Sequence, residues 1–477
     1  MKVPWSSSEW RRVAVYGLGI SGRAAAAFLR RRGVAVVAFD GGAPDPEALG
    51  GLVTDPGIDL RLGAEPRELP PDVDAVVVSP GVPPQRPLLA EARRRGLPVI
   101  AEVELAFPFL DGEVVAVTGS NGKSTTTALA GAMLSAGGLP VEVCGNIGDA
   151  LSSRVEGPPG RIFVVELSSF QLEAVDRFHP RAAALLNLSA DHLDRHGDLS
   201  SYLAAKAAVF RRQTPADTAV LNALDPLVRD LPAASRSGGP RRRFFASRGA
   251  VDDGCHLAGE AVVEVRPGVG PVELFRPAEL PLPGPHNLEN AMAAALLARA
   301  GGAAPAAVAA GVRGFRCLPH RLERVRERRG VTWYDDSKGT NPAATARSLE
   351  GFADGSVHLI LGGRFKGGDL TELCRRVVEK ARRVYLIGEA AEEFARPLAG
   401  AVPLERAGTL ERAVAAAAQR AVAGETVLLS PACSSFDQFE NFAQRGRIFQ
   451  RLVRALEPAN APPTTRRGGD LGAQAGL

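Results

Sequence analysis

The chain has 477 residues, of which 45% are hydrophobic and 23% charged, and its formal net charge is +4. This balance is typical of a soluble globular protein of about three domains, and no apolar run approaches the ~20 residues of a membrane-spanning helix. Aromatic residues make up only 5%, which argues against a stacking surface for nucleic acid. The polar start, Met1–Arg12, lacks the apolar core of a signal peptide. We therefore expect a cytoplasmic monomer that acts on small molecules and binds neither nucleic acid nor membrane.

The first predicted elements form a β-α-β unit. An apolar strand from Val13 to Gly17 precedes an alanine-rich helix that ends near Arg32, and a second strand ends at Asp40. The loop Gly17-Leu18-Gly19-Ile20-Ser21-Gly22 fits the G-x-G-x-x-G fingerprint of dinucleotide-binding folds, with Asp40 about 20 residues downstream. Because this loop can bind any pyrophosphate, a redox cofactor and a nucleotide-linked substrate both stay open.

A further strand, Ala75 to Val78, runs directly into Ser79-Pro80-Gly81. In open α/β sheets, ligands bind at the carboxyl ends of the strands. We therefore expect this loop to face the same ligand as the glycine loop, within a Rossmann-like domain at residues 1–108.

A second α/β domain is predicted at residues 109–316. Its first strand, Val114 to Val117, leads into Gly119-Ser120-Asn121-Gly122-Lys123-Ser124-Thr125 and then into a helix. Backbone N–H groups of such a loop bind phosphate oxygens, Lys123 neutralises the β- and γ-phosphates, and the Ser124 hydroxyl can ligate Mg²⁺. The common G-x-x-x-x-G-K-[ST] spacing requires glycine at position 117, where valine stands. The loop is therefore a shortened phosphate-binding loop, and it predicts ATP with Mg²⁺.

Two polar side chains follow neighbouring strands of this domain. Glu166 ends a strand at Ile162 to Val165, and His192 follows a strand at Ala183 to Leu186. A carboxylate and an imidazole at strand ends beside a γ-phosphate could hold a metal ion. Lys206 lies on a later helix and, from the sequence alone, is a solvated lysine. Residues 241–282 carry short β-like runs with Gly and Pro between them, which predicts a small antiparallel flank on this central parallel sheet.

The pattern then resets into a third, Rossmann-like domain at residues 317–456. Arg321 lies at its start, and Asp335-Asp336-Ser337-Lys338 follows a strand around Trp333. The segment Ser430 to Asp437 again lies between a strand and a helix, where a carboxylate ligand could bind. Residues 457–477 lack any periodicity and are predicted to be a disordered tail.

Together these motifs resemble the Mur ligase family of peptidoglycan synthesis. The resemblance covers residues 12–455 and rests on Gly119–Thr125, Glu166–Gln171, Asn187–Asp194, His286–Asn290, His320-Arg321 and Asp336-Ser337-Lys338. Two segments, Asp336–Asn341 and Ser430–Phe442, are similar to those of the member that adds D-glutamate.

The resemblance implies an α/β protein of three domains that joins D-glutamate to UDP-N-acetylmuramoyl-L-alanine through an acyl phosphate, with ATP and Mg²⁺. It implies catalytic roles for Lys123, His192, Lys206 and Arg321, and metal ligation by Ser124, Glu166, His192 and a carbamylated Lys206. ATP would be bound by Gly119–Thr125, Asn287, Arg321 and Asp336. The other substrates would be bound by Gly19, Ser21, Asp40, Ser79, Gly81, Asn146, Lys338, Ser435 and Phe442. One departure is Gly41, where other members often offer a side chain to the uracil.

Two other classes stay open. One is a different ATP-dependent amide-forming relative, such as a folylpolyglutamate synthase or another Mur member, against which Asp336–Lys338 and Ser434-Ser435 count. The other is a dehydrogenase or a non-catalytic nucleotide-binding regulator. The glycine loop at Gly17 supports that class, but it leaves Lys123 and Glu166 without a role.

Overall fold

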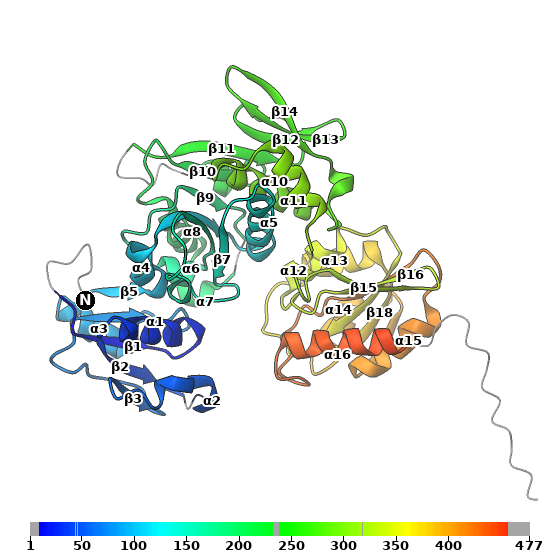
Figure 1. Ribbon diagram of the computed structural model, residues 1–477. Coiled ribbons are helices and arrows are strands. Elements are labelled where there is room, and N and C mark those ends of the chain that lie inside the picture. Colours follow the sequence, from blue (N-terminus) through cyan, green and yellow to red (C-terminus); the bar gives the residue numbers. More distant parts are fainter. Residues whose placement is uncertain are drawn as a thin grey trace, which may run out of the picture. The chain divides into compact units, whose positions relative to one another are not determined.

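The computed structural model describes residues 9–42, 44, 46–189, 191–231, 238–316 and 318–456, and it divides after Arg316 into two compact units (Figure 1). The first unit holds two sheets and the second unit holds one. The predicted tail at residues 457–477 lies outside the described residues. Among the described residues, no helix is both long and apolar enough to cross a membrane.

The first sheet is parallel throughout, in the order β3-β2-β1-β4-β5. Its elements are β1 (Arg12–Tyr16), α1 (Ile20–Arg31), β2 (Ala35–Asp40), α2 (Pro46–Leu49), β3 (Ile58–Leu62), β4 (Ala75–Val78), α3 (Pro87–Arg94), β5 (Val99–Ala101) and α4 (Glu102–Ala106). Both faces of β1 are buried, as is typical of a parallel sheet. Val13 and Val15 pack with α1, whereas Ala14 and Tyr16 pack on the opposite face with α3.

The second sheet has the order β14-β13-β12-β11-β10-β9-β6-β8-β7. Its strands are β6 (Gly112–Thr118), β7 (Val141–Gly145), β8 (Arg161–Glu166), β9 (Ala182–Leu185), β10 (Thr218–Asn222), β11 (Arg241–Ala246), β12 (Gly254–Ala258), β13 (Ala261–Arg266) and β14 (Val269–Phe275). The helices are α5 (Lys123–Ala136), α6 (Ser169–Leu172), α7 (Leu193–His196), α8 (Leu199–Ala207), α9 (Pro226–Arg229), α10 (Pro285–Ala300) and α11 (Pro305–Arg313). Helices α10 and α11 both pack against α5 (Figure 1).

The flank predicted at residues 241–282 is antiparallel only in part. Strand β11 pairs in parallel with β10, and β12 pairs in parallel with β11. Only the β12–β13 and β13–β14 pairs are antiparallel. Gly and Pro mark where strands end but carry no information about pairing direction, so the sequence placed the change of direction too early.

The two sheets of the first unit share one hydrophobic core and are joined by direct hydrogen bonds. The backbone N–H of Ala101 donates to the Ala174 carbonyl at 2.9 Å. The Glu104 carboxylate accepts the N–H groups of Arg177 at 2.8 Å and Phe178 at 3.0 Å. The carboxyl ends of both sheets therefore belong to one packed body.

The second unit is a sheet in the order β15-β16-β20-β17-β18-β19, in which only the β15–β16 edge is antiparallel among the described strands. Its elements are β15 (Glu323–Arg328), β16 (Val331–Asp335), α12 (Pro342–Leu349), β17 (Val357–Gly362), α13 (Thr371–Lys380), β18 (Ala381–Ile387), α14 (Ala391–Leu398), β19 (Leu404–Gly408), α15 (Leu410–Arg420), β20 (Thr426–Leu429) and α16 (Phe442–Ala455). Separate cores on the two faces of the sheet bury α12, α13 and α14 on one side and α15 and α16 on the other. This is the layered α/β arrangement that the sequence predicts.

Candidate active site

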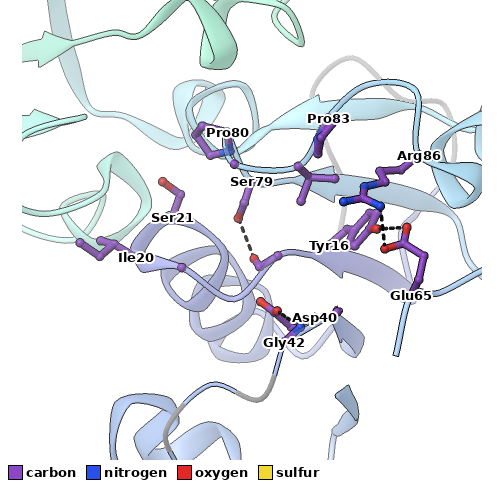
Figure 2. A pocket seen from close by; sticks show the side chains of 15 residues that line it. Tyr16, Ile20, Ser21, Asp40, Gly42, Glu65, Ser79, Pro80, Pro83 and Arg86 are labelled. Atoms are coloured by element: carbon purple, nitrogen blue, oxygen red, sulfur yellow. Dashed lines mark hydrogen bonds and ion pairs between the residues drawn. The ribbon is translucent and has the colours of Figure 1, made fainter. Parts of the chain in front are cut away.

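A cavity of about 550 Å³ lies at the carboxyl ends of the first sheet (Figure 2). All five predicted substrate residues of this sheet line it: Gly19, Ser21, Asp40, Ser79 and Gly81. It is also lined by Tyr16, Glu65 and Arg86, which the sequence did not single out. The size of the cavity suits a small-molecule ligand.

The glycine loop of this cavity depends on the absence of side chains. Gly17 has φ +88°, and a Cβ at Gly22 would lie 1.8 Å from the Gly17 carbonyl oxygen. The Ser79 hydroxyl donates to that same carbonyl at 2.7 Å. Asp40 accepts the N–H of Leu18 at 2.7 Å and the N–H of Gly42 at 2.9 Å, so its carboxylate shapes the loop from within. The loop leaves the N-terminus of α1 open toward the cavity, as a pyrophosphate requires.

The phosphate loop of the second sheet, Gly119–Thr125, is positioned by side chains from other segments of the chain. It connects β6 to α5, and a Cβ at Gly122 would lie 2.2 Å from the side-chain oxygen of Asn290. Asn187 fixes the turn, because its Oδ1 accepts the N–H of Asn121 at 2.9 Å and its Nδ2 donates to the Asn121 carbonyl at 3.1 Å. The Lys123 ammonium donates to the carbonyls of Gly119 at 2.8 Å and Ser120 at 2.9 Å.

Lys206 is buried beside this loop, with only 1% of its surface exposed. Its Nζ donates to the Gly119 carbonyl at 2.8 Å and lies 4.5 Å from the centre of the Tyr202 ring. Burial, with the nearby charge of Lys123, lowers the pKa of Lys206 to about 6. The solvated lysine that the sequence alone indicated is therefore wrong, because α8 turns this side chain inward. At neutral pH the amine is largely uncharged.

Glu166 and Asn146 meet at the ends of β8 and β7. Glu166 is 2% exposed, and its Oε1 accepts the Asn146 amide at 2.9 Å. The other carboxylate oxygen, Oε2, is buried and finds no hydrogen-bond partner among the described residues. An unpartnered buried carboxylate oxygen is costly unless a donor or a cation meets it. The donor set therefore fits a hard cation such as Mg²⁺.

His192 lies at the start of α7. It has φ +54°, and its side chain is about half exposed, at 48%. Its imidazole lies 3.6 Å from Asp191 Oδ2 and packs against the rings of Phe170 and Tyr202. Ser124 is buried in the first turn of α5. Asn287 lies in the first turn of α10, where its amide donates to the Pro283 carbonyl at 2.7 Å.

In the second unit, a buried arginine is hydrogen-bonded to two of the predicted amino-acid-binding loops. Arg445 is 0% exposed; its guanidinium donates to the Ser337 hydroxyl at 3.0 Å, to the Ser337 carbonyl at 2.9 Å and to the Cys433 carbonyl at 3.1 Å. Burial lowers the pKa of Arg445 to about 10. Lys338 lies with its Nζ 4.9 Å from the centre of the Phe442 ring, and Ser435 is 2% exposed. The sequence missed Arg445, although it stands three residues after Phe442 on the same helix.

The turn that carries Arg321 is tied to the Asp336–Lys338 loop. His320 and Leu322, on either side of Arg321, have φ of +62° and +45°. The His320 ring meets Asp335 at 2.6 Å, and the His320 carbonyl accepts the N–H of Lys338 at 3.1 Å.

The Asp336 carboxylate accepts the hydroxyls of Ser348 and Ser430, both at 2.7 Å. Burial raises the pKa of Asp336 to about 6, although these two hydrogen bonds and the charge of Arg321 oppose the shift. Both hydroxyls bond to Oδ2, whereas Oδ1 accepts the backbone N–H of Leu322 at 3.4 Å.

Comparison with known proteins identifies the family. Residues 11–101 match the Mur ligase MurD-like N-terminal domain, residues 117–298 the Mur ligase middle domain, and residues 320–433 the Mur ligase glutamate ligase domain. A UDP-N-acetylmuramoylalanine–D-glutamate ligase of Acidobacterium capsulatum is 44% identical over 459 residues, which are 94% of this chain and 98% of the relative. The chain belongs to the Mur ligase family. This Mur ligase is an ATP-dependent ligase, which confirms the resemblance read from its motifs.

A second relative and two solved structures agree. The ligase of the same name from Myxococcus xanthus is 44% identical over 457 residues, covering 94% of this Mur ligase and 98% of the relative. The UDP-N-acetylmuramate–alanine ligase of Thermotoga maritima has a TM-score of 0.58 at 20% identity, with 93% of this chain and 99% of that chain covered. A MurF ligase of Thermotoga maritima, solved in complex with ADP, has a TM-score of 0.58 at 18% identity, with 94% and 96% covered. These two likenesses support the three-domain α/β fold.

Proposed function

We propose that this Mur ligase joins D-glutamate to UDP-N-acetylmuramoyl-L-alanine, with ATP converted to ADP and phosphate, in cytoplasmic synthesis of peptidoglycan precursors. The observation that carries the reaction type is Lys206, which is buried beside the phosphate loop and donates to the carbonyl of Gly119 at 2.8 Å. The choice of substrates is supported by the names of two relatives, which are 44% identical to this chain over 94% of its length.

The reaction proceeds in two displacements. A carboxylate oxygen of the L-alanyl group attacks the γ-phosphorus of ATP, and ADP leaves with the electrons of the broken P–O bond. Lys123 and Arg321 neutralise the charge that spreads over the transferring phosphoryl group. The amine of D-glutamate then attacks the carbonyl carbon of the acyl phosphate, phosphate leaves, and the amine loses a proton. Activation is needed because a carboxylate and an amine do not condense usefully in water.

Mg²⁺ would be held by Ser124, Glu166, His192 and a carbamylated Lys206. When bound, it supplies positive charge to the phosphate oxygens. The buried, unpartnered Oε2 of Glu166 supports a cation at this place. The imidazole of His192 is half exposed, so a ligand can reach it.

Lys206 would become a ligand by reaction with CO₂. The lone pair of the uncharged amine attacks the carbon of CO₂, an N–C bond forms and one proton is released, which leaves an anionic carbamate. A pKa near 6 favours this step, since only the free amine is a nucleophile. A carbamate offers the oxygen ligands that Mg²⁺ prefers, whereas an ammonium group would repel the ion.

The remaining predicted residues would bind the other ligands. The cavity of the first sheet would hold the UDP, and Asn146 would touch the muramoyl side of the substrate. Asn287 and Asp336 would hold adenosine. D-glutamate would be received by Lys338, Ser435 and Phe442, with Lys338 pairing the side-chain carboxylate. Arg445 is buried beneath these loops and donates to the Ser337 hydroxyl and to the carbonyls of Ser337 and Cys433, so it would hold the amino-acid-binding loops in place.

Phosphate release from ATP tests the proposal. The full chain is incubated with ATP, Mg²⁺ and UDP-N-acetylmuramoyl-L-alanine, and one amino acid is added at a time. We expect release with D-glutamate only. Release that responds to L-lysine or meso-diaminopimelate and not to D-glutamate would overturn the choice of amino acid. A matched reaction without the UDP substrate controls for uncoupled hydrolysis.

A further inference from the structure

The nucleotide cavity has a charged end that the glycine loop does not explain. Tyr16, Glu65 and Arg86 converge there from three elements: the end of β1, the loop after β3 and the loop before α3 (Figure 2). The Tyr16 hydroxyl donates to Glu65 Oε1 at 2.6 Å, and the Arg86 guanidinium lies 3.2 Å from Glu65 Oε2. We call these three residues the Glu65 group.

In the Glu65 group, Tyr16 is buried, whereas Glu65 and Arg86 are partly exposed to the cavity. Tyr16 is 3% exposed, and burial together with the bond to Glu65 raises the pKa of its hydroxyl, so this group stays a hydrogen-bond donor. The side chains of Glu65 and Arg86 are 34% and 46% exposed. A ligand in the cavity can therefore reach a carboxylate acceptor and a guanidinium donor that stand side by side.

The two ends of the cavity face different parts of the first unit. At Pro80, the cavity borders the ATP-binding sheet, because the Arg195 guanidinium donates to the Pro80 carbonyl at 2.5 Å. The reacting carboxylate of the substrate must reach that sheet, so the sugar end of a nucleotide-linked substrate leaves past Pro80. With the pyrophosphate at the N-terminus of α1, the base then lies toward Gly41 and Glu65.

Gly41 lies beside the Glu65 carboxylate and carries no side chain. A Cβ built on Gly41 would stand 3.6 Å from Glu65 Oε2, at van der Waals contact. The carboxylate of Glu65 therefore lies directly beside Gly41. Glycine offers no side-chain contact to a base, and Asp40 already accepts the N–H groups of Leu18 and Gly42. Glu65 and Arg86 are the other two charged side chains that line the cavity.

We propose that Glu65 and Arg86 recognise the Watson–Crick edge of uracil, with Tyr16 as a positioning residue. This inference rests on the proposed function, which supplies a UDP-linked substrate. Uracil presents an N3–H donor between two carbonyl acceptors. Glu65 accepts from N3–H, and Arg86 donates to a neighbouring carbonyl, which is a charge-assisted pair. Cytosine carries a lone pair at N3, which the carboxylate of Glu65 repels.

The experiment measures binding of UDP and CDP to the full chain by calorimetry, in the wild type and in Glu65→Ala, Arg86→Ala and Glu68→Gln. Glu68 is an exposed glutamate of the same loop that does not line the cavity, which makes it a matched control. We expect Glu65→Ala to weaken UDP binding about tenfold or more, as for a lost hydrogen bond to a charged group, and to leave CDP binding nearly unchanged. Arg86→Ala should also lower the UDP-to-CDP ratio, and Glu68→Gln should not.

The outcomes separate the two proposals. If the wild type binds UDP tightly and both alanine variants keep the wild-type ratio of UDP affinity to CDP affinity, the inference is overturned and the proposed function stands. A wild type that binds no uridine nucleotide would overturn the proposed function itself. In steady-state assays the inference further requires that Glu65→Ala raise KM for the UDP substrate while kcat changes less than about twofold, because the base lies far from the reacting carboxylate.

Discussion

Because of Glu102, the stability of the first unit should depend on pH, and a single substitution should remove this dependence. This carboxyl is 2% exposed at the start of α4, and its Oε1 accepts the N–H of Ser152 at 2.5 Å. Its Oε2 and the Ser152 hydroxyl are both buried and without hydrogen-bond partners among the described residues. Burial raises the pKa of Glu102 from 4.5 to about 7, although the hydrogen bond from the Ser152 N–H opposes the shift.

A raised carboxyl pKa in the folded state means that stability falls as pH rises. Below pH 4.5 the group is protonated in both folded and unfolded chains and costs nothing. Between 4.5 and 7 the unfolded chain ionises first, and above 7 the folded chain must hold a buried carboxylate. The shift of about 2.5 units corresponds to about 3 kcal/mol above pH 7, of which about 2.5 kcal/mol is lost between pH 5 and pH 8.

Urea unfolding at pH 5 and pH 8 measures this effect. In a Trp333→Phe background the chain keeps Trp5 and Trp10, and Trp10 is buried in the first unit, so a change in its fluorescence reports on the unfolding of that unit. We expect Glu102→Gln to match its parent within about 1 kcal/mol at pH 5 and to be more stable by up to about 3 kcal/mol at pH 8. The exposed Glu113→Gln serves as the control. Parallel pH curves for Glu102→Gln and its parent would refute the reasoning.

Three further substitutions test the site. Lys206→Ala should abolish turnover and regain part of it with short carboxylic acids such as acetate, which replace the carbamate; wild-type rates in this variant would exclude a carbamate role. Arg445→Lys should raise KM for D-glutamate at least about tenfold, since an ammonium cannot replace a guanidinium that holds several oxygen acceptors, and an unchanged KM would remove Arg445 from the site. Gly22→Ala should weaken UDP binding measured by calorimetry, because its Cβ would meet the Gly17 carbonyl at 1.8 Å; equal affinity would show that the loop can yield.

The strand-end motifs were predictable because topology brings them together. Apolar runs fix the strands, and parallel pairing then places their carboxyl ends at one edge, which is why Gly19, Asp40 and Ser79 line a single cavity. The same logic placed the phosphate loop between β6 and α5. The D-glutamate-adding member was identified from two loop sequences, not from any physical pattern.

The rest depended on packing between segments far apart in sequence. Lys206 is bonded to Gly119, 87 residues away, and Arg445 is bonded to Ser337, 108 residues away. No local periodicity distinguishes such buried cations from the solvated lysines and arginines of other helices. Glu65 was equally hard to predict, because it lines the cavity from the loop after β3, which carries no recognisable motif.

The carbonyl oxygen of Gly119 accepts hydrogen bonds from both Lys123 and Lys206, each at 2.8 Å. Two amines that share one acceptor repel each other as soon as both are protonated, and this repulsion is one cause of the low pKa of Lys206. With the proposed carbamate, the same neighbour becomes an anion, and the repulsion turns into attraction. Reaction with one CO₂ would thus change the charge of the Lys206 side chain, next to Lys123, from positive to negative. Lys123 would keep a counter-ion of its own after ADP and phosphate have left, so the loop would begin each cycle with its lysine already held in place.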